Sequence, residues 1–274
     1  MGTDSAAAAP TGKSATVALV GRPNAGKSTL LNRCLAEQLA IVSDKPQTTR
    51  HRIVGILSES RGQLVFYDTP GVHKPQHRMN RQMVRQAVES MREADIVCLL
   101  ADARQSFGTG DRYMLELPEG VDAIRVLALN KVDLVAKPKL LPRMATYAES
   151  GLFEEIVPIS ALSGEGVEIL LDVLWQVAPA GSPIYDPELL TIHPERFLVA
   201  ERIREKVLAA TRDELPFSTS VLIDHWQEPE PDSRTPLRIF ATILVERPGQ
   251  KKILVGRGGT MIKAIGTAAR QDLE

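Results

Sequence analysis

Short apolar runs alternate with amphipathic stretches along the first two thirds of the chain. Runs rich in Val, Ile and Leu predict buried strands, and the amphipathic segments between them predict helices, among them residues 27–39, 80–93 and 167–177. Continuous apolar strands separated by helices are typical of a mainly parallel sheet covered on both faces, which is an α/β fold. The predicted strands are residues 15–20, 53–57, 63–68, 95–102, 123–130 and 155–160.

The pattern changes after residue 178. Residues 178–187, APAGSPIYDP, are rich in Pro and Gly and predict a linker. A long helix at about 194–211 follows, then strand-like runs at 218–226 and 237–246, a basic stretch, a Gly-rich turn and a last helix, which predict a smaller α+β domain. The predicted divisions are a flexible tail at 1–14, a first domain at 15–178, a linker at 179–192 and a second domain at 193–274.

Length and composition change this picture little. The 274 residues suit two domains, and 43% apolar with 24% charged residues is usual for a globular protein. A formal net charge of −1 gives no sign of nucleic-acid binding by the molecule as a whole, although it leaves room for a local basic patch. Two cysteines, Cys34 and Cys98, are too few for a disulfide framework and predict a reducing compartment. Without a membrane-spanning run or the features of a signal peptide, we expect a cytoplasmic protein.

Residues 21–28, GRPNAGKS, match the phosphate-loop pattern GxxxxGK[ST] directly after a predicted strand and before a predicted helix. Glycines are needed because the backbone must fold around phosphates with its N–H groups pointing inward at a helix N-terminus. In such loops the lysine, here Lys27, places a positive charge on the β- and γ-phosphates, and the hydroxyl of Ser28 ligates Mg²⁺. The motif predicts a nucleoside triphosphate site, but it does not separate ATP from GTP.

Residues 130–133, NKVD, end a predicted strand and indicate guanine. The Asp133 carboxylate can accept hydrogen bonds from the ring N–H and the exocyclic amine of guanine, whereas adenine would leave this buried carboxylate unpaired. Asn130 can tie the loop to the phosphate loop, and the stem of Lys131 can cover a face of the base. A solvated polar turn explains NKVD alone, but not its place after a strand and downstream of a phosphate loop.

Two further segments follow predicted strands. Residues 68–71, DTPG, place Asp68 to hold Mg²⁺ through water and the N–H of Gly71 to reach the γ-phosphate. Residues 160–162, SAL, place a backbone N–H that can donate to O6 of guanine. The residues predicted to bind the nucleotide are Gly21, Arg22, Pro23, Asn24, Ala25, Gly26, Lys27, Ser28, Thr29, Asp68, Gly71, Asn130, Lys131, Asp133, Ser160, Ala161 and Leu162.

The order GRPNAGKS, DTPG, NKVD, SAL resembles the translation-factor-related GTPases, with a P-loop NTPase fold. Residues 45–55, KPQTTRHRIVG, are similar to the first switch region of the Era family of bacterial ribosome-assembly GTPases. The resemblance implies GTP and GDP as ligands, with Mg²⁺ held by Ser28, by Asp68 through water, and by either Thr48 or Thr49. The residues expected to act in catalysis are Lys27, Thr49 and Gly71.

Hydrolysis is expected to be slow. Small signalling GTPases place a Gln after DxxG to orient the attacking water, but this chain has Val72, which cannot hydrogen-bond, and the Era-like group shares this apolar replacement. In relatives of that group the phosphate-loop asparagine, here Asn24, ligates K⁺ beside the phosphates. A simple turn residue is the alternative for Asn24, and the sequence leaves both open.

Residues 251–263, KKILVGRGGTMIK, resemble a KH module, whose GxxG loop clamps the backbone of about four single-stranded nucleotides. From residue 247 to residue 270 there are six Lys or Arg and no acid, which is a footprint for phosphates. Ile253, Val255 and Ile262 either line a groove for bases or belong to the core, and a plain glycine turn is the alternative for the loop. The residues predicted to bind RNA are Lys251, Lys252, Gly256, Arg257, Gly258, Gly259 and Lys263.

The Era resemblance covers residues 15–274 and implies a KH-type domain that continues with a third strand and a last helix. We therefore expect the second domain to be incomplete at its C-terminus, with an open sheet edge.

The implied function is a switch GTPase that binds single-stranded 16S rRNA near its 3′ end during 30S ribosomal subunit assembly. The alternative is an RNA-docking scaffold in which the nucleotide is structural and hydrolysis incidental. GTPases of tRNA modification or large-subunit assembly would need a cofactor-binding N-terminal domain or, usually, a second GTPase domain, which this sequence does not show. We expect a monomer in the cytoplasm. Family analogy leaves peripheral membrane association open, although no lipidation motif supports it.

Overall fold

The computed structural model describes residues 12–43, 45, 48–73, 78–118, 120–211, 219–228 and 236–274. Its contacts divide the chain into two compact units, Met1–Ala40 with Thr49–Ile192, and Ile41–Thr48 with His193–Glu274. Most of the predicted N-terminal tail and the polar turn between the two strands of the second domain lie outside the described residues. Among the residues that are described, no helix has the length and apolar character needed to cross a bilayer.

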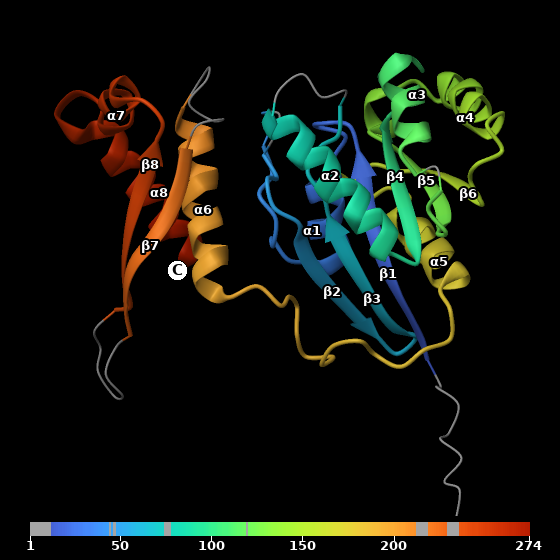
Figure 1. The fold of residues 1–274 in the computed structure, drawn as a ribbon, viewed down its shortest axis with the longest axis horizontal. Coiled ribbons are helices and arrows are strands. Elements are labelled where there is room, and N and C mark those ends of the chain that lie inside the picture. Colours follow the sequence, from blue (N-terminus) through green and yellow to red (C-terminus); the bar gives the residue numbers. More distant parts are fainter. Residues whose placement is uncertain are drawn as a thin grey trace, which may run out of the picture. The chain divides into compact units, whose positions relative to one another are not determined.

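Within its described residues, the first unit is built on a six-stranded sheet in the order β2-β3-β1-β4-β5-β6 (Figure 1). Neighbouring strands pair in parallel, except that β2 is antiparallel to β3. The predicted α/β fold with a mainly parallel sheet is therefore confirmed. The strands are β1 (Lys13–Gly21), β2 (Ile53–Glu59), β3 (Gly62–Asp68), β4 (Ile96–Asp102), β5 (Ile124–Asn130) and β6 (Glu155–Pro158).

Helices cover both faces of this sheet (Figure 1). Ala87 and Met91 of α2, Met114 of α3 and Tyr147 of α4 pack on apolar side chains of β1, β4 and β5 on one face. Helices α1 and α5 contact each other on the opposite face. The helices of this unit are α1 (Lys27–Leu35), α2 (Arg78–Glu93), α3 (Thr109–Glu116), α4 (Leu140–Ala148) and α5 (Val167–Val177), with short 3-10 turns at Val132–Leu134 and Lys137–Lys139.

The prediction that the first helix extends to residue 39 is wrong, because α1 ends at Leu35. Ala36 adopts a left-handed backbone with φ of 53°, which stops the helix. The side chain of Asn32 then holds the following segment, since its Oδ1 accepts hydrogen bonds from the N–H groups of Leu39 and Ala40 at 3.0 and 2.8 Å. A local side chain therefore competes with helix continuation here.

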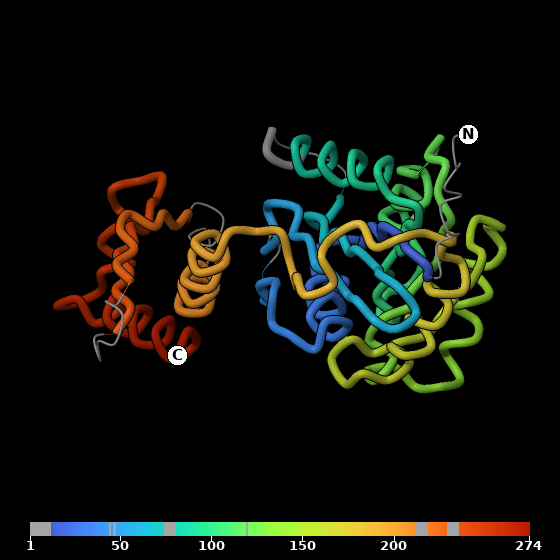
Figure 2. Tube along the Cα trace, turned by 90° about the horizontal axis from the view of Figure 1, so that it is seen from below, coloured from blue at the N-terminus to red at the C-terminus, as the bar shows by residue number. Residues whose placement is uncertain are grey.

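The segment after α5 lies along the antiparallel edge of the first unit. The N–H of Ile56 in β2 donates to the carbonyl of Leu190 at 2.8 Å, and the buried Gln63 of β3 hydrogen-bonds the backbone of residues 184 and 185. Tyr185 also packs on a small apolar cluster formed by β2 and β3. Figure 2 shows this stretch as the yellow-to-gold tube running beside the β2–β3 hairpin.

The second unit combines an antiparallel pair of strands with helices. Strands β7 (Thr219–Gln227) and β8 (Arg238–Val245) pair with a bulge at residues 223–225. Its small core joins Val207 of α6, Leu254 of α7 and Ile265 of α8. The helices are α6 (Glu195–Ala210), α7 (Pro248–Val255) and α8 (Thr260–Leu273), with a 3-10 turn at Arg257–Gly259.

Residues 41–48, which include the start of the predicted switch segment, belong by their contacts to the second unit. Glu205 of α6 accepts a hydrogen bond from the N–H of Val42 at 3.2 Å, and Arg204 donates to the carbonyl of Thr48 at 2.6 Å. The ammonium of Lys45 donates to backbone carbonyls at the C-terminal end of α6, where unpaired carbonyls and the helix dipole favour a cation. A segment that starts after α1 is thus fixed on α6.

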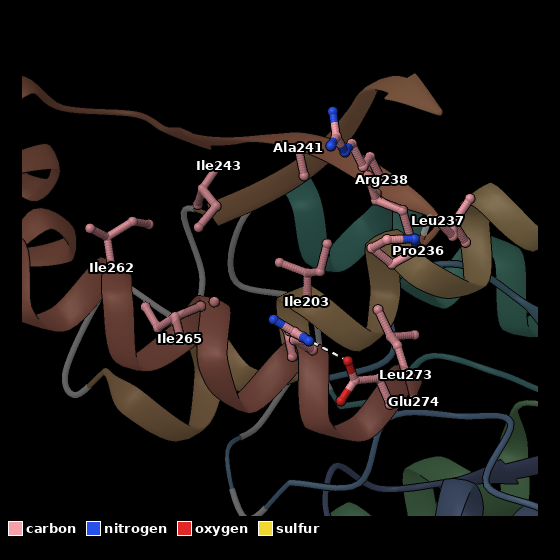
Figure 3. A pocket seen from close by; sticks show the side chains of 14 residues that line it. Ile203, Pro236, Leu237, Arg238, Ala241, Ile243, Ile262, Ile265, Leu273 and Glu274 are labelled. Atoms are coloured by element: carbon pink, nitrogen blue, oxygen red, sulfur yellow. Dashed lines mark hydrogen bonds and ion pairs between the residues drawn. The ribbon is translucent and has the colours of Figure 1, made fainter. Parts of the chain in front are cut away.

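An apolar cavity of about 600 Å³ lies between α6, β8 and α8 of the second unit. Figure 3 shows Ile203, Ala241, Ile243, Ile262 and Ile265 around it, with Leu273 near the end of α8. The described residues thus leave apolar side chains of β8 and α8 facing an open space rather than a filled core.

Candidate nucleotide-binding site and nucleic-acid interface

The carboxyl ends of the parallel strands bring the predicted nucleotide residues to one edge of the sheet. Gly21 ends β1, Asp68 ends β3 and Asn130 ends β5. Open parallel sheets bind ligands at this edge, in the loops that leave the strands. Segments that are far apart in the sequence therefore meet at a single place.

The phosphate loop connects β1 to the first turn of α1. Asn24 and Gly26 have left-handed backbones, with φ of 60° and 98°. A Cβ at Gly26 would collide with the side-chain amide of Asn130, so the sharp turn and the close neighbour both require glycine here. The loop leads directly into the N-terminus of α1 at Lys27, where unpaired N–H groups favour an anion.

A buried polar cluster lies beneath this loop. Lys27 and Asp68 are buried, and the Lys27 ammonium donates to the carbonyls of Gly21 and Arg22 at 3.3 Å each. The Ser28 hydroxyl donates to Asp68 Oδ2 at 2.6 Å, and the Thr49 hydroxyl lies 3.0 Å from that of Ser28.

The structure separates the two candidate switch threonines. The Thr49 hydroxyl lies beside Ser28 and also donates to Asp68 at 3.3 Å. The Thr48 hydroxyl instead donates to the carbonyl of Lys45 at 2.6 Å. Thr49 is therefore the threonine that the fold brings to the polar cluster.

Burial shifts the two ionisable groups of the cluster toward their neutral forms. Loss of solvation lowers the pKa of Lys27 to about 8, although the Asp68 carboxylate partly opposes this. Loss of solvation raises the pKa of Asp68, against the attraction of Lys27 and hydrogen bonds from Ser28 and Thr49. A bound phosphate would therefore favour the charged form of Lys27, and a bound cation would favour the charged form of Asp68.

The same cluster fits Mg²⁺ and phosphate. Asp68 Oδ1 is buried and accepts no hydrogen bond from the described residues, so an acceptor is left over where a cation or its water would bind. Two hydroxyls and a carboxylate are oxygen ligands, which Mg²⁺ prefers, and the lysine and helix N-terminus suit phosphates.

Gly71 of the DTPG segment lies close to the phosphate loop. A Cβ on Gly71 would lie 2.7 Å from the Cα of Pro23, so the DTPG segment can approach the phosphate loop only with glycine here. The next residue, Val72, is buried, and its N–H donates to the carbonyl of Gly21 at 3.0 Å. Its apolar side chain offers no hydrogen bond to a water, in line with the sequence prediction.

Asn130 joins three of the predicted motifs. Its amide donates to the carbonyl of Ala25 in the phosphate loop at 2.8 Å, which confirms the predicted tie between the two loops. Its Oδ1 accepts hydrogen bonds from the N–H groups of Lys131 at 2.8 Å and Ala161 at 2.9 Å. Asp133 is exposed on the same loop, where its carboxylate is accessible to a ligand.

The SAL segment and Arg22 are also anchored. The backbone carbonyls of Ala161 and Leu162 accept hydrogen bonds from Arg33 of α1, while the side chain of Leu162 is 72% exposed. Arg22 of the phosphate loop donates to Gln105 at 2.7 Å and lies 3.6 Å from Asp111 of α3.

Asp102, at the end of β4, was missed by the sequence analysis. Its carboxylate accepts hydrogen bonds from Lys131 at 2.9 Å and from the side chain of Arg104. The available signal was positional, because Asp102 ends a strand just as Asp68 and Asn130 do. It belongs to none of the motifs, and so pattern matching passed over it.

The predicted GxxG loop joins α7 to α8. Gly256, Gly258 and Gly259 have φ of 73°, 61° and 80°, and a Cβ on Gly256 would lie 2.8 Å from the Cβ of Met261. At Gly258 and Gly259 nothing lies within 4 Å of such a Cβ, so the loop surface is open for close approach of another backbone.

Basic and apolar side chains around this loop are exposed. The basic ones are Lys251, Lys252, Arg257 and Lys263. Ile253, Val255 and Ile262 are 54%, 39% and 40% exposed, so they lie outside the buried core of the described residues, and Ile262 also lines the apolar cavity. Exposed cations beside a glycine loop and apolar surface suit a single-stranded nucleic acid.

Comparison with known families matches both units. The model of the 50S ribosome-binding GTPase family matches residues 16–131, and the KH domain model matches residues 227–274. The chain is 47% identical over 262 residues to GTPase Era of Syntrophus aciditrophicus, covering 96% of this chain and 85% of that protein. It is 42% identical to GTPase Era of Staphylococcus haemolyticus, with 96% and 87% covered.

Solved structures of Era are similar to this chain over most of its length. The structure of Era in complex with MgGDPNP and nucleotides 1506–1542 of 16S ribosomal RNA has a TM-score of 0.91 at 34% identity, covering 96% of this chain and 89% of that chain. An Aquifex aeolicus Era variant bound to GDP and AlF4⁻ gives the same values. The predicted resemblance and the predicted fold class are thus confirmed, and the chain belongs to the Era family of GTPases.

Proposed function

We propose that this chain binds GTP and GDP with Mg²⁺, hydrolyses GTP, and couples its nucleotide state to binding of single-stranded RNA near the 3′ end of 16S rRNA during 30S subunit assembly. The observation that carries the nucleotide function is Asn130, which hydrogen-bonds the phosphate loop, the NKVD loop and the SAL segment at once. Relatives with these motifs are named GTPase Era, and one solved relative holds MgGDPNP and a 16S rRNA segment.

Each residue has a role that follows from its position. Lys27 and the N–H groups at the start of α1 bind the phosphates, and Asp133 together with a backbone N–H of the SAL segment recognises guanine. Ser28 and Thr49 would hold Mg²⁺, and Asp68 would contact it through water. Bound Mg²⁺ supplies positive charge that stabilises the transferring phosphoryl group.

Turnover is slow in this proposal, since Val72 cannot position the attacking water. The chain's own contribution to catalysis is then a fixed arrangement of charge, with Lys27, Thr49 and the N–H of Gly71 directed at the phosphates. Asn24 as a K⁺ ligand remains a prediction, which hydrolysis assays in KCl and NaCl would test.

The coupling rests on the switch segment. Residues 41–48 are held by Arg204, Glu205 and the C-terminal end of α6, whereas the next residue, Thr49, has its hydroxyl beside Ser28 and Asp68. Closure of Thr49 on Mg²⁺ would therefore pull on a segment that belongs to the RNA-binding unit. Such order and release of a switch segment is a common device in GTPases.

For RNA, we assign the clamp to the GxxG loop at residues 256–259, with Lys251, Lys252 and Lys263 pairing with phosphates. We keep the predicted boundaries of the GTPase domain at 15–178, the linker at 179–192 and the KH-type domain at 193–274. Family membership also favours action in the cytoplasm on the small-subunit rRNA.

The test is the affinity for a short single-stranded RNA from the 3′ end of 16S rRNA, measured with a non-hydrolysable GTP analogue and with GDP. Tighter binding with the analogue supports the coupled switch. Equal affinity in both states favours the scaffold alternative, and equal affinity for ATP and GTP would refute the guanine site.

A further inference from the structure

A buried carboxylate outside the four motifs links the base-recognising loop to the phosphate loop. Asp102 ends β4 directly beside Asn130, which ends β5 in register with it. The Asp102 side chain is 6% exposed and lies between two cations. It accepts a hydrogen bond from the Lys131 ammonium at 2.9 Å and a forked pair from Arg104 at 2.7 and 3.0 Å.

Lys131 is held at several points. Its ammonium also donates to the carbonyl of Asn24 in the phosphate loop, and its N–H donates to the Asn130 side chain. Its backbone is left-handed with φ of 67°, which is unfavourable for a residue with a side chain and persists only where contacts fix it. The Lys131 stem therefore runs in a fixed path between β4 and the phosphate loop.

The Asp102 carboxylate keeps its negative charge at neutral pH. Burial alone would raise the pKa of Asp102, but hydrogen bonds from Arg104 and Lys131 outweigh it and lower the pKa to about 2. A carboxylate that stays ionised at neutral pH keeps its charge-assisted hydrogen bond with the Lys131 ammonium.

We propose that Asp102 is a positioning residue for the guanine base, because it holds the Lys131 ammonium against the phosphate loop and so fixes the Lys131 stem where it covers the base. The inference rests on the nucleotide function proposed above and adds a residue outside its motifs. Asp102 acts through Lys131, and not through contact with the reacting phosphates, which are served by Lys27 and Ser28.

This role differs measurably from that of a plain structural ion pair. A structural pair would lower stability and turnover together, whereas a positioning residue for the base changes binding and spares the chemical step. The main variant is Asp102→Asn, which keeps the size of the side chain and removes its charge. The matched control is Asp172→Asn on α5, whose carboxylate also pairs with an arginine, Arg61, at 2.6 Å.

GDP affinity is measured by calorimetry on the full chain, and KM and kcat for GTP hydrolysis are measured with Mg²⁺. For Asp102→Asn we expect GDP affinity to fall about tenfold and KM to rise by a similar factor, with kcat within about twofold of the unchanged protein. Asp172→Asn should leave all three unchanged. An Asp102→Asn protein with unchanged GDP affinity, or with kcat reduced as much as affinity, would overturn the proposal.

A second variant tests the same contact in case the Asp102→Asn protein fails to fold. Lys131→Met keeps the apolar stem and removes the ammonium, so it should weaken GDP binding about as much as Asp102→Asn. The double variant should be no weaker than either single one, because both break the same contact. Additive losses would overturn the proposal. Failure of the unchanged protein to bind GDP would refute the nucleotide function itself, and this is a separate outcome.

Discussion

The two predicted sites of this protein are built in opposite ways. At the nucleotide site, Lys27, Asp68 and Asn130 are buried and hold one another or the backbone in fixed geometry. Around the GxxG loop, Lys251, Lys263 and the apolar side chains are exposed. A small ligand of fixed shape is bound best by a preorganised site, whereas a flexible single strand is bound by accessible charge and open glycine backbone.

The difference has consequences for what each site tolerates. Buried charges depend on their partners, so single changes at the nucleotide site should have large effects. Exposed charges are screened by salt and act additively, so single changes at the RNA site should have smaller effects, except where the backbone itself must be approached.

The largest effect is expected for Lys27→Ala. Removing the buried ammonium takes away the charge that faces the phosphates and leaves Asp68 buried without its cation, so GDP affinity should fall at least about a hundredfold. Calorimetry with GDP checks this. The control is Lys251→Ala, an exposed lysine whose loss should leave GDP binding unchanged. Retention of GDP affinity within about threefold in Lys27→Ala would contradict the buried-site interpretation.

Gly258→Asp should be next, with RNA affinity reduced about thirtyfold by a negative charge where the RNA backbone must approach. Gly258 has a left-handed backbone with φ of 61°, which Asp adopts more readily than most residues, and nothing lies within 4 Å of a Cβ there, so the fold should survive at a cost of about 1 kcal/mol. GDP affinity should be unchanged. Fluorescence anisotropy with labelled RNA measures the effect. Gly249→Asp is the control, since a Cβ there also meets nothing. Equal losses in both variants would mean that general charge, and not the loop, decides binding.

Salt should separate the two sites without any mutation. Raising monovalent salt from about 50 to 200 mM should weaken RNA binding about tenfold. Each RNA phosphate that the protein contacts releases bound counterions, and this release is less favourable at higher salt. GDP affinity should change much less, since its charges are buried and poorly screened. Both are measured at constant Mg²⁺. A GDP affinity that falls as steeply as the RNA affinity would remove the contrast between the sites.

High pH should weaken nucleotide binding through Lys27. With its pKa lowered to about 8, the amine loses its proton above that pH and must regain it when phosphates bind, so GDP affinity should fall about eightfold from pH 7.5 to 9.0. By the same linkage, the free folded chain binds fewer protons than the unfolded chain between pH 8 and 10.5. Its stability therefore gains a contribution as pH rises through that window. Calorimetry in buffers of different ionisation enthalpy should detect proton uptake above pH 8, and no uptake would contradict this assignment.

The smallest effect concerns the link between the sites. Arg204→Ala removes the hydrogen bond to the carbonyl of Thr48 and the ion pair with Glu201 at 2.7 Å. We expect the ratio of RNA affinities with GTP analogue and GDP to shift toward one by about two- to threefold, with GDP affinity itself unchanged. Anisotropy in the two nucleotide states measures the ratio. An unchanged ratio would show that this contact does not transmit the signal.

The amino-acid sequence by itself determined the strands of the first unit, the phosphate loop, the NKVD loop and the GxxG loop. These features are local, since a phosphate loop is a contiguous turn of backbone at Asn24 and Gly26 that ends in a helix, and apolar runs specify buried strands wherever they occur. Residues such as Lys27 and Asp133 could therefore be named before the fold was known.

The tertiary structure alone decided which distant residues meet. Thr49 rather than Thr48 lies beside Ser28, and the Thr48 hydroxyl donates to the carbonyl of Lys45 instead. Asp102 reaches Lys131 because β4 and β5 pair in a register that ends both strands side by side. Such contacts depend on strand register and helix packing, which arise from the whole chain and leave no pattern in any single segment.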